Sequence, residues 1–271
     1  MKYLEFNGIR FSADSPFPFY SFSPNEGTTE YQSDTFVGQD GENITNIRYP
    51  SRTVSLSGNI VADTDEQFIV YRQQLFTKCN GKTKEELYYF DGFTKYKAAA
   101  IANIPQLGET HATSQVYNVN FILLDFYWQR ADKTVIPLFE RIDMVETSFT
   151  LPCVFTKRTA GATIYNGTDF DIYPILKIGI INSETVNLKI KNETSGAVIE
   201  LPNYSFNAGE TLIIDTEKYK ATINGINIIN SLNDFSDWRI SPGENVITIK
   251  NEENSVSLNA VIEYNDKLVG V

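Results

Sequence analysis

Side chains that commonly carry catalysis or bind transition metals are scarce in this chain of 271 residues. It holds one histidine, His111, and two cysteines, Cys79 and Cys153. A nucleophilic triad needs a base, usually histidine, and a zinc site needs several His, Cys or carboxylate ligands. His111 lies in the polar stretch GETHATSQ, which is typical of a solvated loop, and no glycine-rich phosphate-binding motif is present. We therefore expect no catalytic residue, no metal site, no cofactor and two reduced cysteines.

Basic charge is also in short supply. The chain has 23 Lys and Arg against 34 Asp and Glu, a formal net charge of −11. Residues 1–130 carry 11 basic and 15 acidic side chains, and residues 131–271 carry 12 and 19, so both halves are acidic. Tight binding to nucleic acid requires cations that neutralise phosphates. The charge balance argues against a nucleic-acid-binding protein, whereas an acidic wall would let DNA pass without adhering to it.

Long apolar runs are missing. No segment approaches the ~20 apolar residues of a membrane span, and the start, MKYLEFNGIRFSADS, lacks the apolar core of a signal peptide. The 15 Tyr and 18 Phe favour β-sheets, where aromatic side chains fit the pleated surface. The length predicts about two domains. We place the boundary at the charged segment near Arg130, which gives domains of residues 1–130 and 131–271.

Turn signals separate short alternating strands along most of the chain. Asn7-Gly8 and Asn224-Gly225 each lie between short apolar segments, which predicts two-residue hairpin turns. The segment 241–244 reads Ser-Pro-Gly-Glu, which predicts a type II turn with positive φ at Gly243. Repeated short strands at intervals of about 8–12 residues are typical of an all-β sandwich or jelly roll. We expect that architecture for the second domain.

One segment, residues 64–79, predicts an α-helix. Thr64 and Gln67 fit a capping box, in which the threonine hydroxyl accepts a hydrogen bond from the amide three residues later. Phe68, Tyr71, Leu75 and Phe76 recur at helical spacing and would cover one face. We expect this helix to pack against the sheet of the first domain.

Residues 23–52 form a long polar segment that is rich in Gly, Asn and Asp. Such a segment is either a mobile loop or an arm that becomes ordered against a partner. Arg and Tyr are enriched at protein interfaces, so we take five arm residues as subunit-interface candidates: Phe36, Ile47, Arg48, Tyr49 and Arg52. From chemistry alone, surface arginines paired with carboxylates of the same chain explain Arg48 and Arg52 equally well.

Two further functions have some support in the sequence. Trp238 and Tyr204 are weak candidates for an aromatic platform that stacks on sugars, provided that they are exposed. Asp169 and Asp171 are the nearest approach to the paired carboxylates of a glycosidase, or to a calcium site. A turn that leads into a strand explains this stretch better, and aromatic residues at this density belong more often to a core.

The order of these elements resembles the distal tail proteins of long, non-contractile-tailed bacteriophages that infect Gram-positive bacteria. The N-terminal match is GQDGENITNIRYPSRTVSLSGNI, with a Tyr-x-x-Arg element at Tyr49 and Arg52, followed by the capped helix. The C-terminal match runs from Asn166-Gly167 through IKNETSGAVIEL, AGETLIIDTEKYKATING and SPGENVITI. The family's Asn-Gly-Asp turn appears here as Asn-Gly-Thr-Asp, a small change in turn chemistry.

The resemblance implies a mainly β protein: an N-terminal ring-forming β domain with one helix, and a C-terminal galectin-like β-sandwich. It implies a six-fold ring of identical chains that joins the tail tube protein to the tail-tip protein (a tail-associated lysin) and carries receptor-binding proteins. DNA would pass through the ring without specific binding. The protein would be made in the cytoplasm of the bacterial host and located at the tail tip of the virion. The alternative is a carbohydrate-binding module that attaches to the host cell wall.

Overall fold

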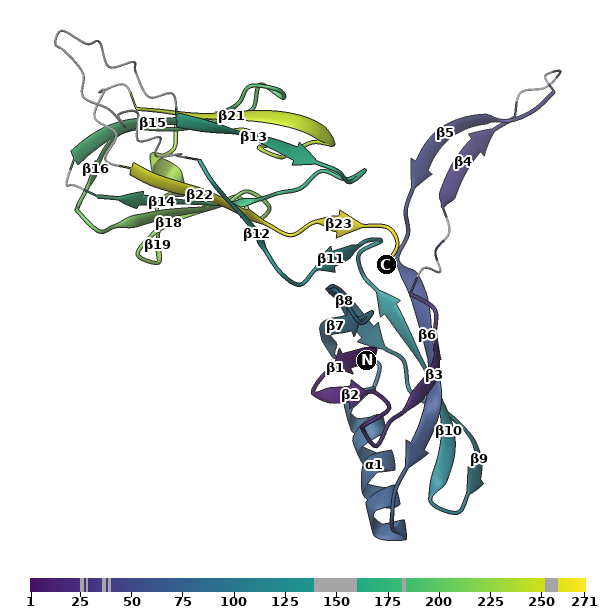
Figure 1. Cartoon of the computed structure of the whole chain (residues 1–271). Helices are drawn as coiled ribbons and strands as arrows, with labels where there is room; N and C mark the ends of the chain where they lie inside the picture. Colours follow the sequence, from purple (N-terminus) through teal and green to yellow (C-terminus); the bar gives the residue numbers. More distant parts are fainter. Residues whose placement is uncertain are drawn as a thin grey trace, which may run out of the picture. The chain divides into compact units, whose positions relative to one another are not determined.

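The computed structural model describes residues 1–24, 27, 29–35, 38, 40–138, 160–181, 184–251 and 258–271. These form two compact units, one of Met1–Ala131 with Lys267–Val271 and one of Asp132–Asp266. The domain boundary that we placed near Arg130 assigned the C-terminal residues to the second domain. The structure corrects this for the last five residues, because β23 pairs with β11 of the first unit (Figure 1).

Ten strands of the described residues form the main sheet of the first unit, in the order β2-β1-β7-β8-β10-β6-β3, with β9 beside β10 and β11 between β8 and β23. All its pairs are antiparallel. The strands are β1 (Tyr3–Phe6), β2 (Ile9–Phe11), β3 (Phe19–Phe22), β6 (Arg52–Val61), β7 (Lys84–Phe90), β8 (Lys95–Ala102), β9 (Gln106–His111), β10 (Ser114–Leu123), β11 (Trp128–Arg130) and β23 (Lys267–Leu268). Alternate residues of β6 and β10 are buried, as their period-two patterns predict.

The helix α1 (Asp65–Lys78) confirms the predicted segment. Thr64 Oγ1 accepts a hydrogen bond from the Gln67 amide at 3.3 Å, which caps the helix. Phe68 and Leu75 are buried in the core of the first unit. Cys79, directly after the helix, is also buried there, and burial raises the pKa of its thiol to about 12. No helix in the described part of the chain is long and apolar enough to cross a membrane.

The second unit is a sandwich of two antiparallel sheets (Figure 1). One sheet consists of β12 (Thr134–Pro137), β22 (Leu258–Tyr264), β14 (Ile175–Ile180), β17 (Thr211–Asp215), β18 (Lys220–Ile223) and β19 (Ile226–Asn227). The other consists of β13 (Ala160–Asn166), β21 (Gly243–Asn251), β15 (Glu184–Asn192), β16 (Val198–Phe206) and β20 (Asp234–Phe235), and a 3₁₀ turn spans Ile229–Ser231. Both sheets contribute to one apolar core, for example Ile178 and Leu212 from the first and Ile190 and Ile247 from the second. The predicted all-β sandwich is confirmed.

The turn predictions are confirmed at the positions where the backbone requires special residues. Asn7 and Gly8 have φ of 45° and 79°, and Asn224 and Gly225 have φ of 50° and 83°. Both pairs therefore adopt the left-handed conformations of a type I′ hairpin. Gly243 has φ of 90°, as the type II turn needs.

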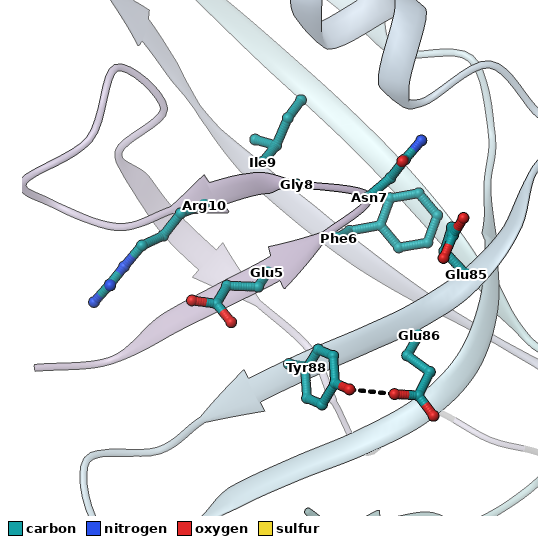
Figure 2. A pocket seen from close by; sticks show the side chains of 9 residues that line it. All are labelled: Glu5, Phe6, Asn7, Gly8, Ile9, Arg10, Glu85, Glu86 and Tyr88. Atoms are coloured by element: carbon teal, nitrogen blue, oxygen red, sulfur yellow. Dashed lines mark hydrogen bonds between the residues drawn. The ribbon is translucent and has the colours of Figure 1, made fainter.

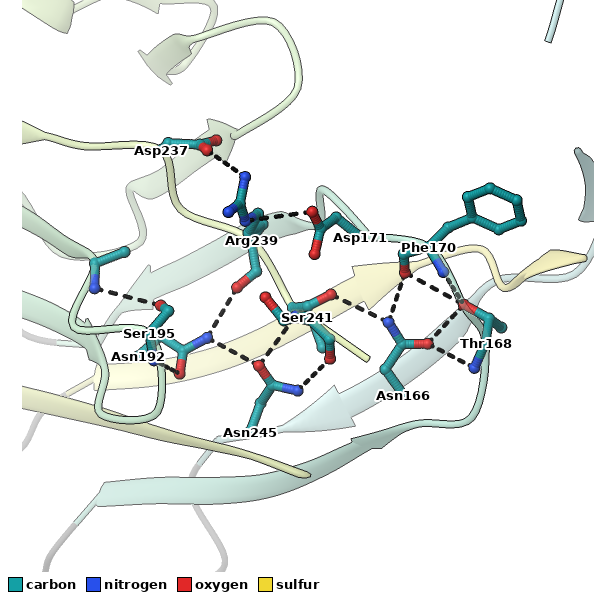
Figure 3. A network of polar contacts seen from close by, with 12 residues as sticks. Asn166, Thr168, Phe170, Asp171, Asn192, Ser195, Asp237, Arg239, Ser241 and Asn245 are labelled. Atoms are coloured by element: carbon teal, nitrogen blue, oxygen red, sulfur yellow. Dashed lines mark hydrogen bonds and ion pairs between the residues drawn. The ribbon is translucent and has the colours of Figure 1, made fainter. Parts of the chain in front are cut away.

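Three buried asparagines, Asn166, Asn192 and Asn245, hold the loops at one end of the sandwich (Figure 3). The Nδ2 of Asn245 donates to the carbonyl oxygens of Ser241 (2.7 Å) and Gly243 (3.1 Å). Its Oδ1 accepts from the Ser241 amide (3.0 Å) and from Asn192 Nδ2 (3.1 Å). Asn245 thus uses its full hydrogen-bonding capacity inside the protein, which makes it a strong determinant of the loop conformation.

Candidate subunit interface

The polar segment that we interpreted as a loop or an arm contains a β-hairpin of its own. Strand β4 (Glu30–Asp34) pairs with β5 (Asn43–Arg48), and neither pairs with another strand of the described residues (Figure 1). The hairpin lies in the sequence between β3 and β6, which are themselves neighbours in the main sheet. It therefore extends that pair of strands. We call residues 29–50 the arm.

Several apolar side chains of the arm are exposed to solvent, where they do not stabilise an isolated hairpin. All six residues of β5 are exposed. Tyr31 and Ile47 lie directly opposite each other across the strands, and they are 62% and 60% exposed. A two-stranded ribbon without a packed face is at best marginally stable in water. An exposed cross-strand pair of this kind is typical of a surface that a partner covers.

The arm is also acidic. It contains Glu30, Asp34, Asp40 and Glu42 against the single cation Arg48. Arg48 forms an ion pair with Glu30, with 2.6 Å between Nη2 and Oε2. Among the described residues, no ion pair involves the other three carboxylates, which lie toward the tip of the arm.

The root of the arm is built around Phe126, in the loop between β10 and β11. Tyr49 stacks on the ring of Phe126, with 4.4 Å between centroids and 23° between planes. The Arg52 guanidinium carbon lies 5.3 Å from the centre of the same ring. On the other side of the hairpin, Gly27 lies so close that an added Cβ would be 3.2 Å from Phe126. Trp128, fully buried, donates its indole N–H to the carbonyl of Pro24 at 3.0 Å.

Arg52, the first residue of β6, is only 3% exposed. Its Nη1 donates to the carbonyl oxygen of Val269 at 2.7 Å, which ties the C-terminal segment to the root. Its Nε and Nη2 are buried and have no hydrogen-bond partner in the described structure. Burial lowers the pKa of Arg52, because a charged group loses its hydration there.

The predicted interface residues differ in how deeply they are buried. Ile47, Arg48 and Tyr49 lie exposed on the arm or at its root. Arg52 is buried instead, so the interpretation as a surface arginine paired with a carboxylate is wrong for it and correct for Arg48. Phe36 lies outside the described residues. Sequence reasoning missed Phe126 as the centre of the root; its only signal was its position in the aromatic stretch DFYW.

Trp238 is not available to stack on a sugar in the folded protein. Trp238 is 1% exposed and belongs to the core of the sandwich. Tyr204 is half-buried and packs against Phe206, with 4.7 Å between ring centroids. Asp171 forms an ion pair with Arg239 at 3.4 Å, and Arg239 also pairs with Asp237 at 2.6 Å (Figure 3). Asp171, one of the two carboxylates considered for glycoside hydrolysis, is therefore part of a surface ion-pair network.

A pocket of about 490 Å³ lies where the β1–β2 hairpin meets β7 (Figure 2). Two of its three glutamates are paired within the sheet: Glu5 with Lys95 at 3.1 Å, and Glu86 with Lys97 at 3.5 Å. The hydroxyl of Tyr88 donates to Glu86, which raises the pKa of Tyr88 to about 12. The described residues contain no group of three or more His, Cys, Asp or Glu side chains placed to hold a metal ion. The third glutamate, Glu85, and Arg10 line the same pocket, and no ion pair of the described residues involves either of them.

Comparison with known proteins identifies both units. The family described as phage tail protein RIFT-related domain matches residues 6–123, and the C-terminal domain of the siphovirus-type tail component matches residues 166–267. The crystal structure of SPP1 Dit, described as a paradigm of the hub adsorption apparatus in phages that infect Gram-positive bacteria, is similar over 99% of both chains, with 14% identity and a TM-score of 0.73. A chain of the phage P2 baseplate in its activated conformation with Ca is similar over 100% of both chains, with 11% identity and a TM-score of 0.55. No sequence among the curated proteins matches.

Two tail-protein domains in succession define a structural component of a siphophage tail. The chain belongs to the distal tail protein family of siphophages. It is a component of the virion tail, as the sequence predicted.

Proposed function

We propose that copies of this chain assemble through the arm into a closed six-fold ring at the tip of the tail. The ring joins the tail tube protein to the tail-tip protein and carries the receptor-binding proteins, while DNA passes through it without specific binding. The role is structural and includes no catalytic step. The family supports a place in the tail, and the similar SPP1 Dit protein is described as part of a hub adsorption apparatus.

The arm is the observation that carries this proposal. A ring of identical chains needs a heterologous interface, in which one surface of each copy contacts a different surface of the next. The arm offers the first of these surfaces: a hairpin that, within the described chain, pairs only with itself, with Tyr31 and Ile47 exposed opposite each other. Covering these side chains on a neighbour would remove apolar area from water and stabilise the ring.

The test is the mass of the purified chain as a function of concentration, measured by mass photometry. The parent is expected to form a discrete oligomer with the mass of six chains. The double variant Tyr31→Ser, Ile47→Ser is expected to weaken assembly by about 100-fold or more, since burying two such side chains contributes roughly 3 kcal/mol or more. Its circular dichroism should not change, because both side chains are exposed in the isolated chain.

A matched control is Ile226→Ser in β19 of the second unit, where the side chain is 71% exposed. This variant removes exposed apolar surface away from the arm and should assemble like the parent. A parent that stays monomeric at high concentration, or an arm variant that assembles as the parent does, would rule the proposal out.

A further inference from the structure

We propose that Arg52 is a receptor for a carboxylate, and that the carboxylate comes from the arm of a second copy of this chain. The inference rests on the proposed function, because it assigns a partner to the root of the arm during ring assembly. The candidate carboxylates are Asp34, Asp40 and Glu42, and we expect one of them to occupy the site in each subunit pair.

The geometry of the unpaired donors points to a carboxylate. Nη1 of Arg52 is already used by the carbonyl oxygen of Val269. The two orphaned donors, Nε and Nη2, lie on the same edge of the planar guanidinium. Two parallel N–H groups on one edge match the two oxygens of a carboxylate, which accept them as a bidentate pair.

Because Arg52 is buried, leaving its Nε and Nη2 donors without an acceptor costs free energy. Its side chain is enclosed by the root, with Phe126 against the guanidinium and Gly27 next to the Cδ. A buried cation without a counterion loses hydration that a single hydrogen bond does not replace. The isolated chain therefore holds a charge that is destabilising until an anion pairs with it.

The arm of another copy is the source of carboxylate that fits best. Asp34, Asp40 and Glu42 are exposed, and no ion pair of the described residues involves them. Glu30 is excluded because Arg48 holds it. The hairpin strand from residue 30 to 34 spans roughly 13 Å at ~3.3 Å per residue, so a chain's own arm tip does not reach its own root. The arm of a neighbouring copy can reach the root. Because Nε and Nη2 of Arg52 are buried in the isolated chain, the root must rearrange on assembly to admit the carboxylate.

The experiment is a set of double-mutant cycles on ring assembly, measured by mass photometry over a range of concentrations. Arg52→Met removes the charge and keeps an apolar stem of similar length; Asp34→Asn, Asp40→Asn and Glu42→Gln each remove one arm charge. We expect Arg52→Met to weaken assembly at least about tenfold and to leave the melting temperature of the dissociated chain equal or higher. One of the three acid variants should weaken assembly of the parent by a similar factor. In the Arg52→Met background the same variant should cause no further weakening.

Controls separate the possible outcomes. Arg72→Met on the exposed face of α1 removes an arginine from the same unit and should assemble as the parent does. If the parent forms no oligomer, the proposed function fails. If the parent forms rings but no acid variant weakens them, or the effects of the acid and Arg52 variants simply multiply, the carboxylate receptor is wrong and the ring stands. The acid variants lie at exposed positions, so they test the idea even if Arg52→Met does not fold.

Discussion

Replacing Gly58 by alanine is expected to destabilise the first unit strongly. Gly58 lies in the middle of β6, opposite Tyr117 of β10. An added Cβ would be 2.3 Å from the carbonyl oxygen of Pro18 and 2.5 Å from the hydroxyl oxygen of Tyr117. Both distances are far below van der Waals contact, so β3 or Tyr117 must move.

Neither neighbour can move cheaply. The carbonyl oxygen of Pro18 accepts the Asn59 amide at 2.9 Å, and Tyr117 is fully buried with its hydroxyl donating to the carbonyl of Phe17 at 3.2 Å. Overpacking of a close-packed core costs about 1–3 kcal/mol and occasionally more. Since backbone is one of the clashing groups, we expect the upper end of that range, about 3 kcal/mol or above. Urea unfolding followed by circular dichroism measures this loss.

Gly179→Ala is the matched control. Gly179 also lies inside a strand, β14, but an added Cβ there would meet only the carbonyl oxygen of Asn259 at an ordinary 3.6 Å. That variant should unfold within about 0.5 kcal/mol of the parent. Equal stability of the Gly58 and Gly179 variants would contradict the packing described around β3 and β6.

The second large effect is expected at Asn245 in the sandwich. Asn245→Leu keeps the approximate volume but leaves the Ser241 amide, the Ser241 and Gly243 carbonyls and Asn192 without their partner. Buried polar groups left unsatisfied cost about 1–3 kcal/mol each. With relaxation around the loops, we expect a total loss of roughly 3–5 kcal/mol from the second unit.

Tryptophan fluorescence can assign this loss to one unit. The chain has two tryptophans: Trp128, buried in the first unit, and Trp238, buried in the second. In a Trp128→Phe background, emission reports the sandwich alone, and the unfolding midpoint of Asn245→Leu should drop sharply. Asn259→Leu, at an exposed position of β22 in the same unit, should leave the midpoint nearly unchanged. A small shift for Asn245→Leu would mean that the asparagine network does not hold these loops.

Local signals in the sequence predicted the elements whose conformation depends on neighbouring residues. The positive φ of Asn7 and Gly8 and the cap at Thr64 follow from residue chemistry within three or four positions. The sandwich followed from period-two alternation, and membership of the distal tail family followed from the order of these motifs. Each of these features requires no knowledge of contacts distant in the sequence.

Features that depend on distant contacts could not be read from the sequence. The burial of Arg52 comes from Val269 and Phe126, which are 217 and 74 positions away. Trp238 looked available for stacking on sugars because its burial depends on both sheets of the sandwich. The return of β23 to the first unit depends on its pairing with β11. An exposed arginine and a buried one have the same local signature.

These distant contacts also relate the arm to the rest of the first unit. Trp128 binds the chain before the arm through Pro24, and it pairs in β11 with Leu268 of β23. Arg52 binds the chain after the arm to Val269. Both ends of the arm are thus fixed to the same C-terminal segment, and the position of the hairpin follows from the packing of the main sheet. A firmly held root is what an arm needs if it is to meet a neighbour at a defined place.

The most direct test of the central claim is a cryo-electron microscopy reconstruction of the purified full chain. Our account predicts closed six-fold rings in which the arm of each copy lies on the next copy, with Tyr31 and Ile47 covered. A single chain in every class, or a ring in which the arms point into solvent away from the subunit boundaries, would contradict it.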